Sequence, residues 1–196
     1  KANVKAAVCG FNFRFGKMGL GDSDTLRELM GDGGCIIVPP VYRDGRLVSS
    51  TAIRLFISAG EMDKAADMLG RPFFIDFPVV HGKQLGRTIG IPTINQNFPE
   101  GHIIPKSGIY ACTVDIGGDI FLGVSNVGTR PTIKNDRHVI NCETHIINYN
   151  GWLYGKDIKV SFHKRLRDEM KFPDIDSLKA QIGRDIVSTK EYFSDK

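Results

Sequence analysis

The second half of the chain consists of short runs in which apolar and polar residues alternate, with glycine-rich turns between them. The clearest example is residues 108–128, GIYACTVDIGGDIFLGVSNVG, where two alternating runs flank Gly117-Gly118. A two-residue glycine turn between such runs is typical of a β-hairpin. The runs at 138–149 and 156–164 alternate in the same way. Short strands at regular spacing predict a small antiparallel barrel or sandwich.

A helix is expected near the end of the chain, in the segment DIDSLKAQIGRDIVSTKEYF. Leu178, Ile182 and Ile186 recur there at helical spacing. Apolar residues at this spacing share one face of a helix. We therefore expect this helix to pack its apolar face on the barrel.

The first part of the chain mixes strand and helix patterns. Residues 4–10 and 35–41 are apolar runs typical of buried strands. Residues 23–31, SDTLRELMG, predict a short helix that is capped by Ser23 or Asp24 and ended by its final glycine. Strands that alternate with helices indicate an α/β layer.

Two further helices are predicted before the barrel, at residues 49–60 and 61–70. Each of these segments ends in glycine, which often terminates a helix. The segment LGRPFFIDFPV, residues 69–79, then combines a proline with the start of a strand. We place the boundary between the two parts of the chain in this segment.

The overall composition limits the possible partners. The net charge of +4 suits anionic ligands such as nucleotides without requiring nucleic acid. No apolar run reaches the roughly 18 residues of a membrane helix. The cysteines form no CxxC pair, so a zinc site is not expected, and buried free thiols in a cytoplasmic protein are the favoured interpretation. They are Cys9, Cys35, Cys112 and Cys142.

Residues 81–95, HGKQLGRTIGIPTIN, are rich in glycine and raise the question of a phosphate site. They are not a P-loop, because the glycine spacing is one residue short and Arg87 stands where lysine is required. Pro92 also opposes a following helix, and the dinucleotide motif GxGxxG is absent. The glycines could cradle phosphates with their backbone N–H groups or could simply form tight turns.

The residues after these glycines strengthen the functional interpretation. In an extended segment, Thr93 and Asn95 point to the same face. A hydroxyl and an amide oxygen are hard ligands that suit Mg²⁺, which also bridges phosphates. The alternative is that both side chains only satisfy the hydrogen bonds of a turn.

The run VINCETHII provides a candidate base. Its alternation places Ile140, Cys142, Thr144 and Ile146 on one face, and Asn141, Glu143 and His145 on the other. Glu143 could accept a proton from a substrate hydroxyl. Alternatively, the polar face is merely solvated.

The segment SSTAIR provides a candidate anion site. Ser49 and Ser50 open a helix, Thr51 lies in its first turn and Arg54 follows one turn later. Hydroxyls at a helix N-terminus with a guanidinium nearby can bind an anion. The alternative is ordinary capping by serine.

Taken together, these segments resemble one family closely, the bifunctional riboflavin kinase/FAD synthetases of bacteria. The resemblance covers essentially the whole chain. No single motif is decisive, but the ordered series is highly specific. The series is GFNFRFG, SSTAIR, AADMLGRPF, HGKQLGRTIGIPTIN, SGIYACTV, GVSNVGTRPT, CETHI, YG and KRLRDEMKF.

The resemblance implies two domains. Residues 74–196 would be a riboflavin kinase module, a six-stranded antiparallel β-barrel with a C-terminal helix. Such a module transfers the γ-phosphate of ATP to the 5′-hydroxyl of riboflavin and yields FMN. Residues 1–73 would be the C-terminal part of a Rossmann-like nucleotidyltransferase that adenylylates FMN to FAD.

The resemblance also implies roles for single residues. Thr93 and Asn95 match the Mg·ATP residues of the family's PTAN motif, Glu143 matches the catalytic base, and Arg167 matches a residue near the flavin. The partners would be ATP, riboflavin and FMN. The implied ATP site comprises Gly82, Lys83, Gly86, Arg87, Gly90, Thr93, Asn95, Ser50, Thr51 and Arg54.

Two departures from the family pattern matter. PTAN is PTIN here, and Ile94 should point away from the metal. The GxFDGxHxGH motif of the adenylyltransferase has no counterpart, and GFNFRFG carries Asn12 where aspartate is usual. We expect this chain to form FMN but not FAD, and the encoded protein to be longer at its N-terminus.

Two other functions compete with this interpretation. A flavin- or nucleotide-binding module without turnover would keep the glycine loop but would need no base. An RNA-binding barrel would carry basic strands interleaved with aromatic residues, whereas the central strands here are neutral.

Overall fold

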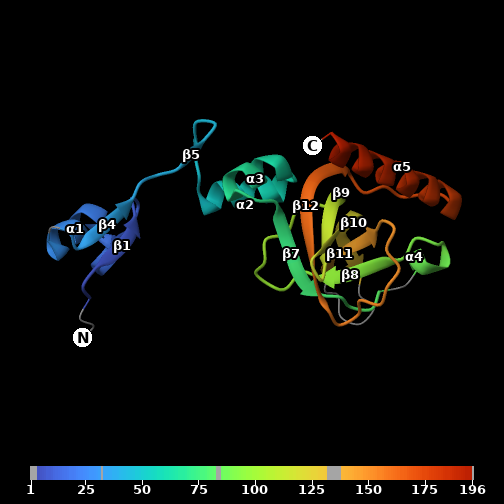
Figure 1. The fold of residues 1–196 in the computed structure, drawn as a ribbon, viewed down its shortest axis with the longest axis horizontal. Coiled ribbons are helices and arrows are strands. Elements are labelled where there is room, and N and C mark those ends of the chain that lie inside the picture. Colours follow the sequence, from blue (N-terminus) through green and yellow to red (C-terminus); the bar gives the residue numbers. More distant parts are fainter. Residues whose placement is uncertain (1–3, 32, 83–84, 132–137, 196) are drawn as a thin grey trace. The chain divides into compact units, whose positions relative to one another are not determined.

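The computed structural model describes residues 4–31, 33–82, 85–131 and 138–195. They form two compact units, Lys1–Ser49 and Ser50–Lys196, and Figure 1 labels most of their elements. None of the described helices combines the length and the apolar composition that a bilayer crossing requires.

The first unit contains a parallel strand pair with a helix between its strands in sequence. Strand β1 (Ala7–Gly10) pairs with β4 (Cys35–Val38), and α1 (Ser23–Met30) connects them. This arrangement confirms the predicted α/β character. The remaining elements are short: β2 (Arg14–Phe15), the 3-10 turn η1 (Lys17–Gly19), β3 (Gly21–Asp22), β5 (Tyr42–Arg43) and β6 (Arg46–Leu47).

The cap of α1 differs from the prediction. The side chain of Asp22, rather than Ser23 or Asp24, accepts a hydrogen bond from the backbone N–H of Thr25 at 2.9 Å. Asp22 has extended backbone angles, as an N-cap requires. Ser23 is already helical, and its hydroxyl donates to the carbonyl of Phe11 instead.

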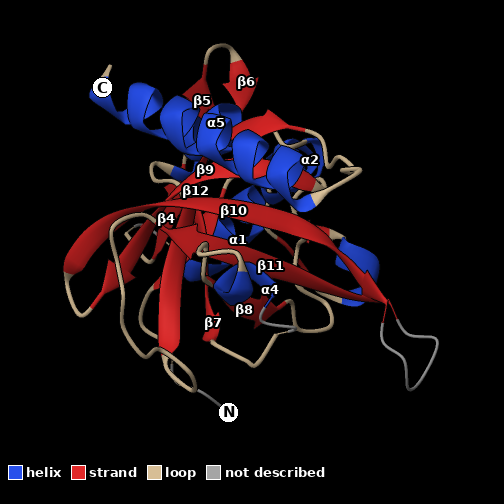
Figure 2. Ribbon diagram, turned by 90° about the vertical axis from the view of Figure 1, so that its right-hand side faces the viewer, coloured by secondary structure: helices blue, strands red, loops and turns tan. Residues whose placement is uncertain are grey.

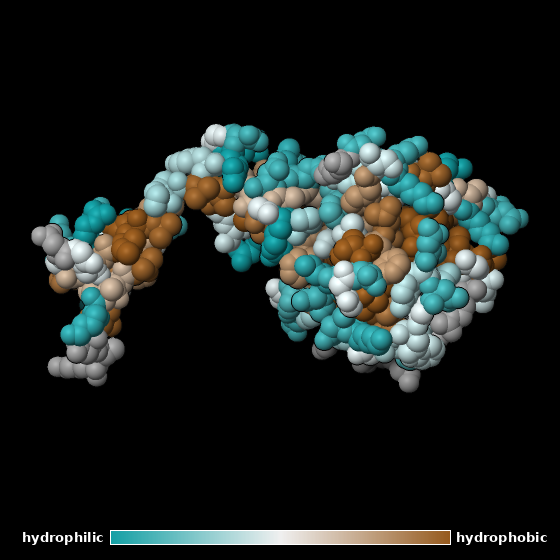
Figure 3. All heavy atoms as spheres, viewed as in Figure 1, coloured by the Kyte–Doolittle hydropathy of each residue, from teal (hydrophilic) through white to brown (hydrophobic). Residues whose placement is uncertain are grey.

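Apolar side chains gather over the strands of this unit on the face that Figure 3 shows. Val8 and Ile36 lie opposite each other in register and are 67% and 62% exposed. Parallel sheets are normally covered on both faces. The strand pair therefore presents apolar surface of a kind that α/β folds usually bury.

The second unit is a six-stranded antiparallel sheet with the strand order β7-β12-β9-β10-β11-β8. Edge strands β7 and β8 approach each other just beyond β7, where the N–H of Val80 donates to the carbonyl of Asn95 at 2.8 Å. The sheet therefore curls round on itself, which confirms the barrel (Figure 2). Its strands are β7 (Phe73–Pro78), β8 (Thr93–Asn97), β9 (Gly108–Ile116), β10 (Asp119–Pro131), β11 (His138–Ile146) and β12 (Asp157–Arg167).

The predicted hairpin is formed by β9 and β10. Gly117 and Gly118 make its turn with φ values of 67° and 98°, and Ile116 pairs with Asp119 on either side. Positive φ at both turn residues suits glycine. The two-residue connection therefore sets the register between β9 and β10.

In the described part of this unit, four helices accompany the sheet: α2 (Ser50–Ala59), α3 (Met62–Leu69), α4 (Leu85–Thr88) and α5 (Ile175–Ser194). The ends of α2 and α3 are as predicted, with Gly60 and Gly70 at φ values of 78° and 70°. Helix α5 confirms the amphipathic C-terminal helix. Asp174 caps it by accepting from the N–H of Ser177 at 2.7 Å.

Two apolar clusters lie on opposite faces of the sheet, one inside the barrel and one outside it. The main core fills the interior and includes Val160 and Phe162 of β12, together with Ile57 and Met62 from the two helices before the sheet. The second cluster lies on the outer face, under α5. It consists of Ile109, Val124 and Ile147, with Leu122, Leu166 and Ile186 packed against them.

Candidate active site

Polar residues from three neighbouring strands form a row on the outer face of the barrel. Glu143 of β11 lies opposite Asn95 of β8 on one side and opposite Asn126 of β10 on the other. In the next row, His145 pairs with Thr93. Cross-strand partners point to the same face, with Cβ atoms about 4.5–5.5 Å apart. The register thus brings together Thr93, Asn95 and Glu143, as the expected site requires.

The alternation predicted for β11 is confirmed. Cys142 and Thr144 are fully buried in the barrel interior, whereas Glu143 and His145 line a cavity on the outer face. Burial raises the pKa of Cys142 to about 11. The thiol behind the glutamate is therefore protonated and inert at neutral pH.

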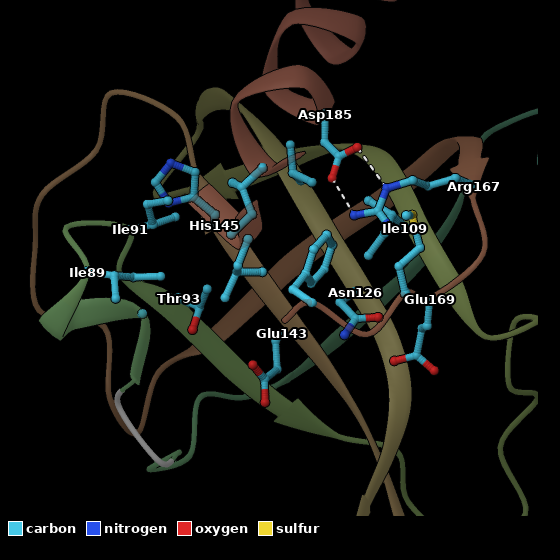
Figure 4. A pocket seen from close by; sticks show the side chains of 16 residues that line it. Ile89, Ile91, Thr93, Ile109, Asn126, Glu143, His145, Arg167, Glu169 and Asp185 are labelled. Atoms are coloured by element: carbon cyan, nitrogen blue, oxygen red, sulfur yellow. Dashed lines mark hydrogen bonds and ion pairs between the residues drawn. The ribbon is translucent and has the colours of Figure 1, made fainter. Parts of the chain in front are cut away.

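The cavity lies between the outer face of the sheet and α5 (Figure 4). Its volume is about 250 Å³, far more than a single water needs. One end is polar and carries Thr93, Asn126, Glu143 and Glu169. The remaining wall is largely apolar and includes Ile89, Ile91, Ile109, Phe172, Leu178 and Ile182.

Asn141 ties the central residues of the row together. Its side-chain Nδ2 donates to Glu143 Oε1 at 3.1 Å and to Asn95 Oδ1 at 3.3 Å. Asn141 is only 4% exposed, so the polar face of β11 is not simply solvated. The buried amide holds the carboxylate of Glu143 beside the amide of Asn95.

Asn95 is confined by the backbone of the glycine stretch. It is 5% exposed, and a Cβ atom on Gly82 would lie 2.5 Å from its Nδ2 atom. Real Cβ atoms essentially never come so close. The absence of a side chain at Gly82 therefore lets the loop lie directly against the polar row.

The rest of the glycine stretch forms a short helical turn and then reverses. Helix α4 includes Gly86, whose carbonyl accepts from the N–H of Ile91 at 2.7 Å, and Gly90 has a φ of 79°. A four-residue helix before Pro92 was not predicted. Lys83 lies outside the described residues, as does the side chain of Arg87.

His145 fixes the segment that carries Thr93. Its Nδ1 atom lies 2.9 Å from the carbonyl oxygen of Pro92. A carbonyl only accepts, so Nδ1 carries the proton in this contact. The hydrogen bond holds Pro92 at the edge of the cavity, one residue before Thr93.

Arg167 is held by α5. It forms a two-pronged ion pair with Asp185, with distances of 2.9 and 2.7 Å (Figure 4). Gln181 donates to the same carboxylate at 2.9 Å. Arg167 and Asp185 both line the cavity, and the role of Arg167 beside a flavin stays a prediction. Its guanidinium is engaged by the helix.

The loop after β12 is anchored next to this pair. Arg165 donates to the carbonyl of Ser107 at 2.6 Å and to the carboxylate of Asp168 at 2.5 Å. The hydrogen bond and the positive charge of Arg165 lower the pKa of Asp168. The anchored loop then leads to Glu169 and Phe172 in the wall of the cavity.

A second cavity adjoins the first and shares Thr93 with it. Its volume is about 540 Å³, and Trp152 and Tyr154 contribute to its wall. The rings of Tyr154 and His81 stack with centroids 4.0 Å apart, and Trp152 remains 66% exposed. Thr93 therefore stands at the junction of a largely apolar cavity and an aromatic one.

Several of these residues had no predicted role. Asn141 appeared only as part of the polar face, and Asn126, Asp185 and Trp152 were not considered. For Asn126 a signal exists in the sequence, because it follows Leu122 and Val124 in the alternation and introduces a polar group on an apolar face.

The segment SSTAIR lies apart from this site. It begins α2, as predicted, but Ser50, Thr51 and Arg54 are exposed and line neither cavity. Figure 1 shows α2 and α4 on opposite sides of the second unit. The anion-binding role of this segment stays a prediction.

Comparison with known proteins gives one consistent result. Residues 69–193 match the family model described as "Flavokinase: Riboflavin kinase". The bifunctional riboflavin kinase/FMN adenylyltransferase of Bacillus subtilis is 37% identical over 195 residues, which are 98% of this chain and 62% of the relative. The protein of the same name from Escherichia coli K12 is 38% identical over 97% of this chain and 61% of its own length. The chain thus spans about three fifths of these relatives.

The fold also matches a solved structure. A crystal structure described as a macrolide-efflux protein from Streptococcus pneumoniae superimposes with a TM-score of 0.81 and 33% sequence identity. The match covers 92% of this chain and 58% of that one.

Proposed function

The chain belongs to the riboflavin kinase family, and from that premise we propose that its second unit transfers the γ-phosphoryl group of ATP to the 5′-hydroxyl of riboflavin. One observation carries the proposal. Glu143 stands at the polar end of a largely apolar cavity, beside Asn95 and Thr93. Riboflavin, a planar aromatic ring system that carries a polar chain, has the same division between an apolar and a polar part.

In the proposed reaction the 5′-oxygen attacks the γ-phosphorus, and the bond from that phosphorus to the β–γ bridging oxygen breaks. The hydroxyl proton passes to the carboxylate of Glu143, and FMN and ADP are the products. Phosphoryl transfer of this kind goes through a loose transition state, so positioning and charge neutralisation dominate. The hydrogen bond from Asn141 to Glu143 supports this assignment, because it orients the carboxylate.

We place ATP in the second cavity, with its phosphates toward Thr93. Trp152 and Tyr154 line this cavity, and the largely exposed ring of Trp152 offers a face on which a purine can stack. We place the backbone at Gly82, Gly86 and Gly90 on the phosphate side; at Gly90 no atom lies within 4 Å of the missing Cβ position. This placement leaves the first cavity for the flavin ring.

The same row of residues suits a magnesium ion. Thr93 and Asn95 supply a hydroxyl and an amide oxygen. Within the described parts of the chain, Asn95 Oδ1 accepts a single long hydrogen bond, from Asn141 at 3.3 Å. Mg²⁺ typically takes few protein oxygens and completes its shell with phosphates and water. When bound, it would neutralise phosphate charge during transfer.

Adenylylation of FMN to FAD is proposed only for a longer protein. The first unit, residues 1–73 in the expected division, would be the C-terminal part of that domain, with SSTAIR on the ATP phosphates. The motif GxFDGxHxGH is absent from these 196 residues. We also propose a cytoplasmic location, since all four cysteines are free.

Flavin chromatography after incubation with riboflavin and Mg·ATP tests the proposal. We expect FMN and ADP in equal amounts, no FMN when the divalent cation is chelated, and no FAD. Riboflavin binding without FMN formation would instead support a non-catalytic flavin module. FAD formed by this chain would contradict the restriction of adenylylation to a longer protein.

A further inference from the structure

Asn126 is the one residue of the central polar row whose buried oxygen has no partner. It lies on β10, opposite Glu143 on one side and Ile109 on the other, and it lines the cavity under α5. Its Oδ1 atom is buried, and no hydrogen-bond donor reaches it from the described residues. Buried polar atoms are nearly always paired, so this acceptor calls for a ligand donor.

The neighbouring side chains cannot supply the missing donor. Glu143 and Glu169 flank Asn126 in Figure 4, and ionised carboxylates only accept. Glu169 packs against Gly128, two residues along the same face of β10, where a Cβ atom would collide with its carboxylate. The other cavity residue beside Asn126, Ile109, is apolar. The polar end of the cavity is therefore rich in acceptors.

A ligand that fits such an end must bring several donors. The chain of riboflavin is a polyol, and its hydroxyls are the donors nearest to the reacting 5′-hydroxyl. Asn126 is the direct cross-strand neighbour of Glu143, so their Cβ atoms lie about 4.5–5.5 Å apart. A group that contacts Asn126 is thus close to the group that contacts Glu143.

We propose that Asn126 Oδ1 accepts a hydrogen bond from a hydroxyl of the flavin's polyol chain and thereby positions the terminal hydroxyl at Glu143. This inference rests on the proposed function and goes further, because it assigns recognition of the chain, as distinct from the ring, to one residue. A site built to bond a hydroxyl strongly disfavours an analogue that lacks it. Asn126 would make the enzyme selective for flavins with a hydroxylated chain.

The test compares riboflavin with lumiflavin, which has the same ring system and a methyl group in place of the polyol chain. Binding of both is measured by flavin fluorescence in wild type and Asn126→Ala. For the variant we expect the riboflavin Kd to rise roughly 10- to 100-fold, the range of a lost hydrogen bond at a buried polar group. The lumiflavin Kd should change less than about twofold, since this ligand makes no such bond.

A matched control is Asn97→Ala, on the same sheet. Asn97 is exposed and lines neither cavity, so both Kd values should stay at the wild-type level. In steady-state assays, Asn126→Ala should raise the KM for riboflavin while the KM for ATP stays constant. A general distortion of the barrel would change both.

Each outcome decides a separate question. Equal weakening of both flavins in Asn126→Ala would assign the residue to packing and overturn the inference. Unchanged riboflavin binding would overturn it as well. After either of these two outcomes, the proposed function would still stand if the wild-type protein bound riboflavin and formed FMN. If wild type bound neither flavin, the proposed function itself would fall.

Discussion

At the scale of single residues, the site depends on a short chain of contacts around Glu143. Asn141 holds the carboxylate, the amide of Asn95 lies beside it, and the glycine backbone at Gly82 closes over that amide. Asn95 and Asn141 are both nearly inaccessible to solvent. Substitutions at these positions should therefore disturb the geometry around Glu143 and also cost folding stability.

Replacement of Glu143 by glutamine keeps the shape of the side chain and removes the proton acceptor. General-base catalysis typically contributes about 10²–10⁴-fold to the rate, so kcat should fall by that factor. Riboflavin binding should change far less. Steady-state kinetics and fluorescence titration measure the two effects. Glu100→Gln, at an exposed position, is the control. If kcat decreases by less than about fivefold, Glu143 is not the general base.

A methyl group at Gly82 should disturb the metal end of the site. In Gly82→Ala the new Cβ atom would lie 2.5 Å from Asn95 Nδ2, so the amide or the loop must move. A displacement of about 1 Å can cost roughly 10²-fold in rate. We expect a lower kcat/KM for Mg·ATP and a requirement for more Mg²⁺, both measured by titrating Mg²⁺ against rate.

The control for this change is Gly183→Ala. Gly183 lies within α5 and has open space around it, so alanine there should stabilise the helix by up to about 1 kcal/mol without altering the Mg²⁺ response. An unchanged Mg²⁺ titration in a folded Gly82→Ala variant would argue against metal binding at Asn95.

At the scale of elements, α5 both covers the cavity and fixes a residue of the sheet. Leu178 and Ile182 line the cavity, Ile186 packs on the apolar cluster of the outer face, and Asp185 binds Arg167 of β12. The side chains of Arg167 and Asp185 are only 18% and 6% exposed. The helix is therefore tied to β12 by a largely buried ion pair.

Removal of one member of this pair should be costly. Asp185→Ala leaves the Arg167 guanidinium largely buried without its partner, which typically costs about 3–5 kcal/mol. Urea unfolding measures the loss. In a double variant, Arg167→Met with Asp185→Leu, most of the stability should return, because apolar replacement of both partners is often neutral. An equally unstable double variant would show that packing at these positions, and not the unpaired charge, causes the loss.

At the scale of the whole molecule, the barrel core extends beyond the strands. Ile57, Met62 and Ala65, from α2 and α3, are buried in the same cluster as Val160 and Phe162 of the sheet. The second compact unit accordingly begins at Ser50, whereas the family match begins at residue 69. The boundary at 73/74 stays a prediction that truncation can test.

Two fragments separate these possibilities. Residues 50–196 should fold and form FMN at the rate of the full 196-residue chain, because they contain the entire core cluster. Residues 74–196 should be strongly destabilised. Burial of one isoleucine or methionine is worth about 1.5–3 kcal/mol, and loss of both helices removes a large part of the roughly 5–15 kcal/mol of a typical domain. Thermal unfolding and FMN assays measure the difference; equal stability of the two fragments would support the boundary at 73/74.

The core also predicts how stability responds to alkaline pH. Burial raises the pKa of Tyr110 to about 12, against a reference value of 10.0. Below pH 10 the tyrosine is neutral in both states and its contribution is fully present. Between pH 10 and pH 12 the unfolded chain ionises first, so the free energy of unfolding falls, and the loss levels off above pH 12.

Tyr110→Phe should remove this part of the pH dependence. The variant should be about 1 kcal/mol less stable at pH 8, because the hydroxyl donates to the carbonyl of Lys106. It should then lose less stability than wild type between pH 10 and pH 12. Urea midpoints at pH 8, 10, 11 and 12 provide the comparison. The pKa values of Cys112 and Cys142 are also raised by burial, and they act equally in both proteins. Parallel losses in both would exclude Tyr110 as the source.

The sequence by itself determined several of the longer elements and, in β11, the side of the strand on which each residue lies. Alternation placed Glu143 opposite in direction to Cys142, the Gly117-Gly118 turn predicted the β9–β10 hairpin, and helical spacing predicted α5. These features depend on neighbours along the chain, where period and turn chemistry act directly. The order of motifs added the family and the proposed roles of Thr93 and Asn95.

Only the tertiary structure decided which distant residues meet. The register of three strands sets Asn126 and Asn95 on either side of Glu143, and the packing of α5 pairs Asp185 with Arg167. The alternation of apolar and polar residues predicts which face of a strand a residue lies on, but not which strand pairs with it. Strand order and the docking of a helix depend on burial across the whole barrel. The same limit applies to the cap of α1, where the backbone conformation makes Asp22 the cap instead of the predicted Ser23 or Asp24.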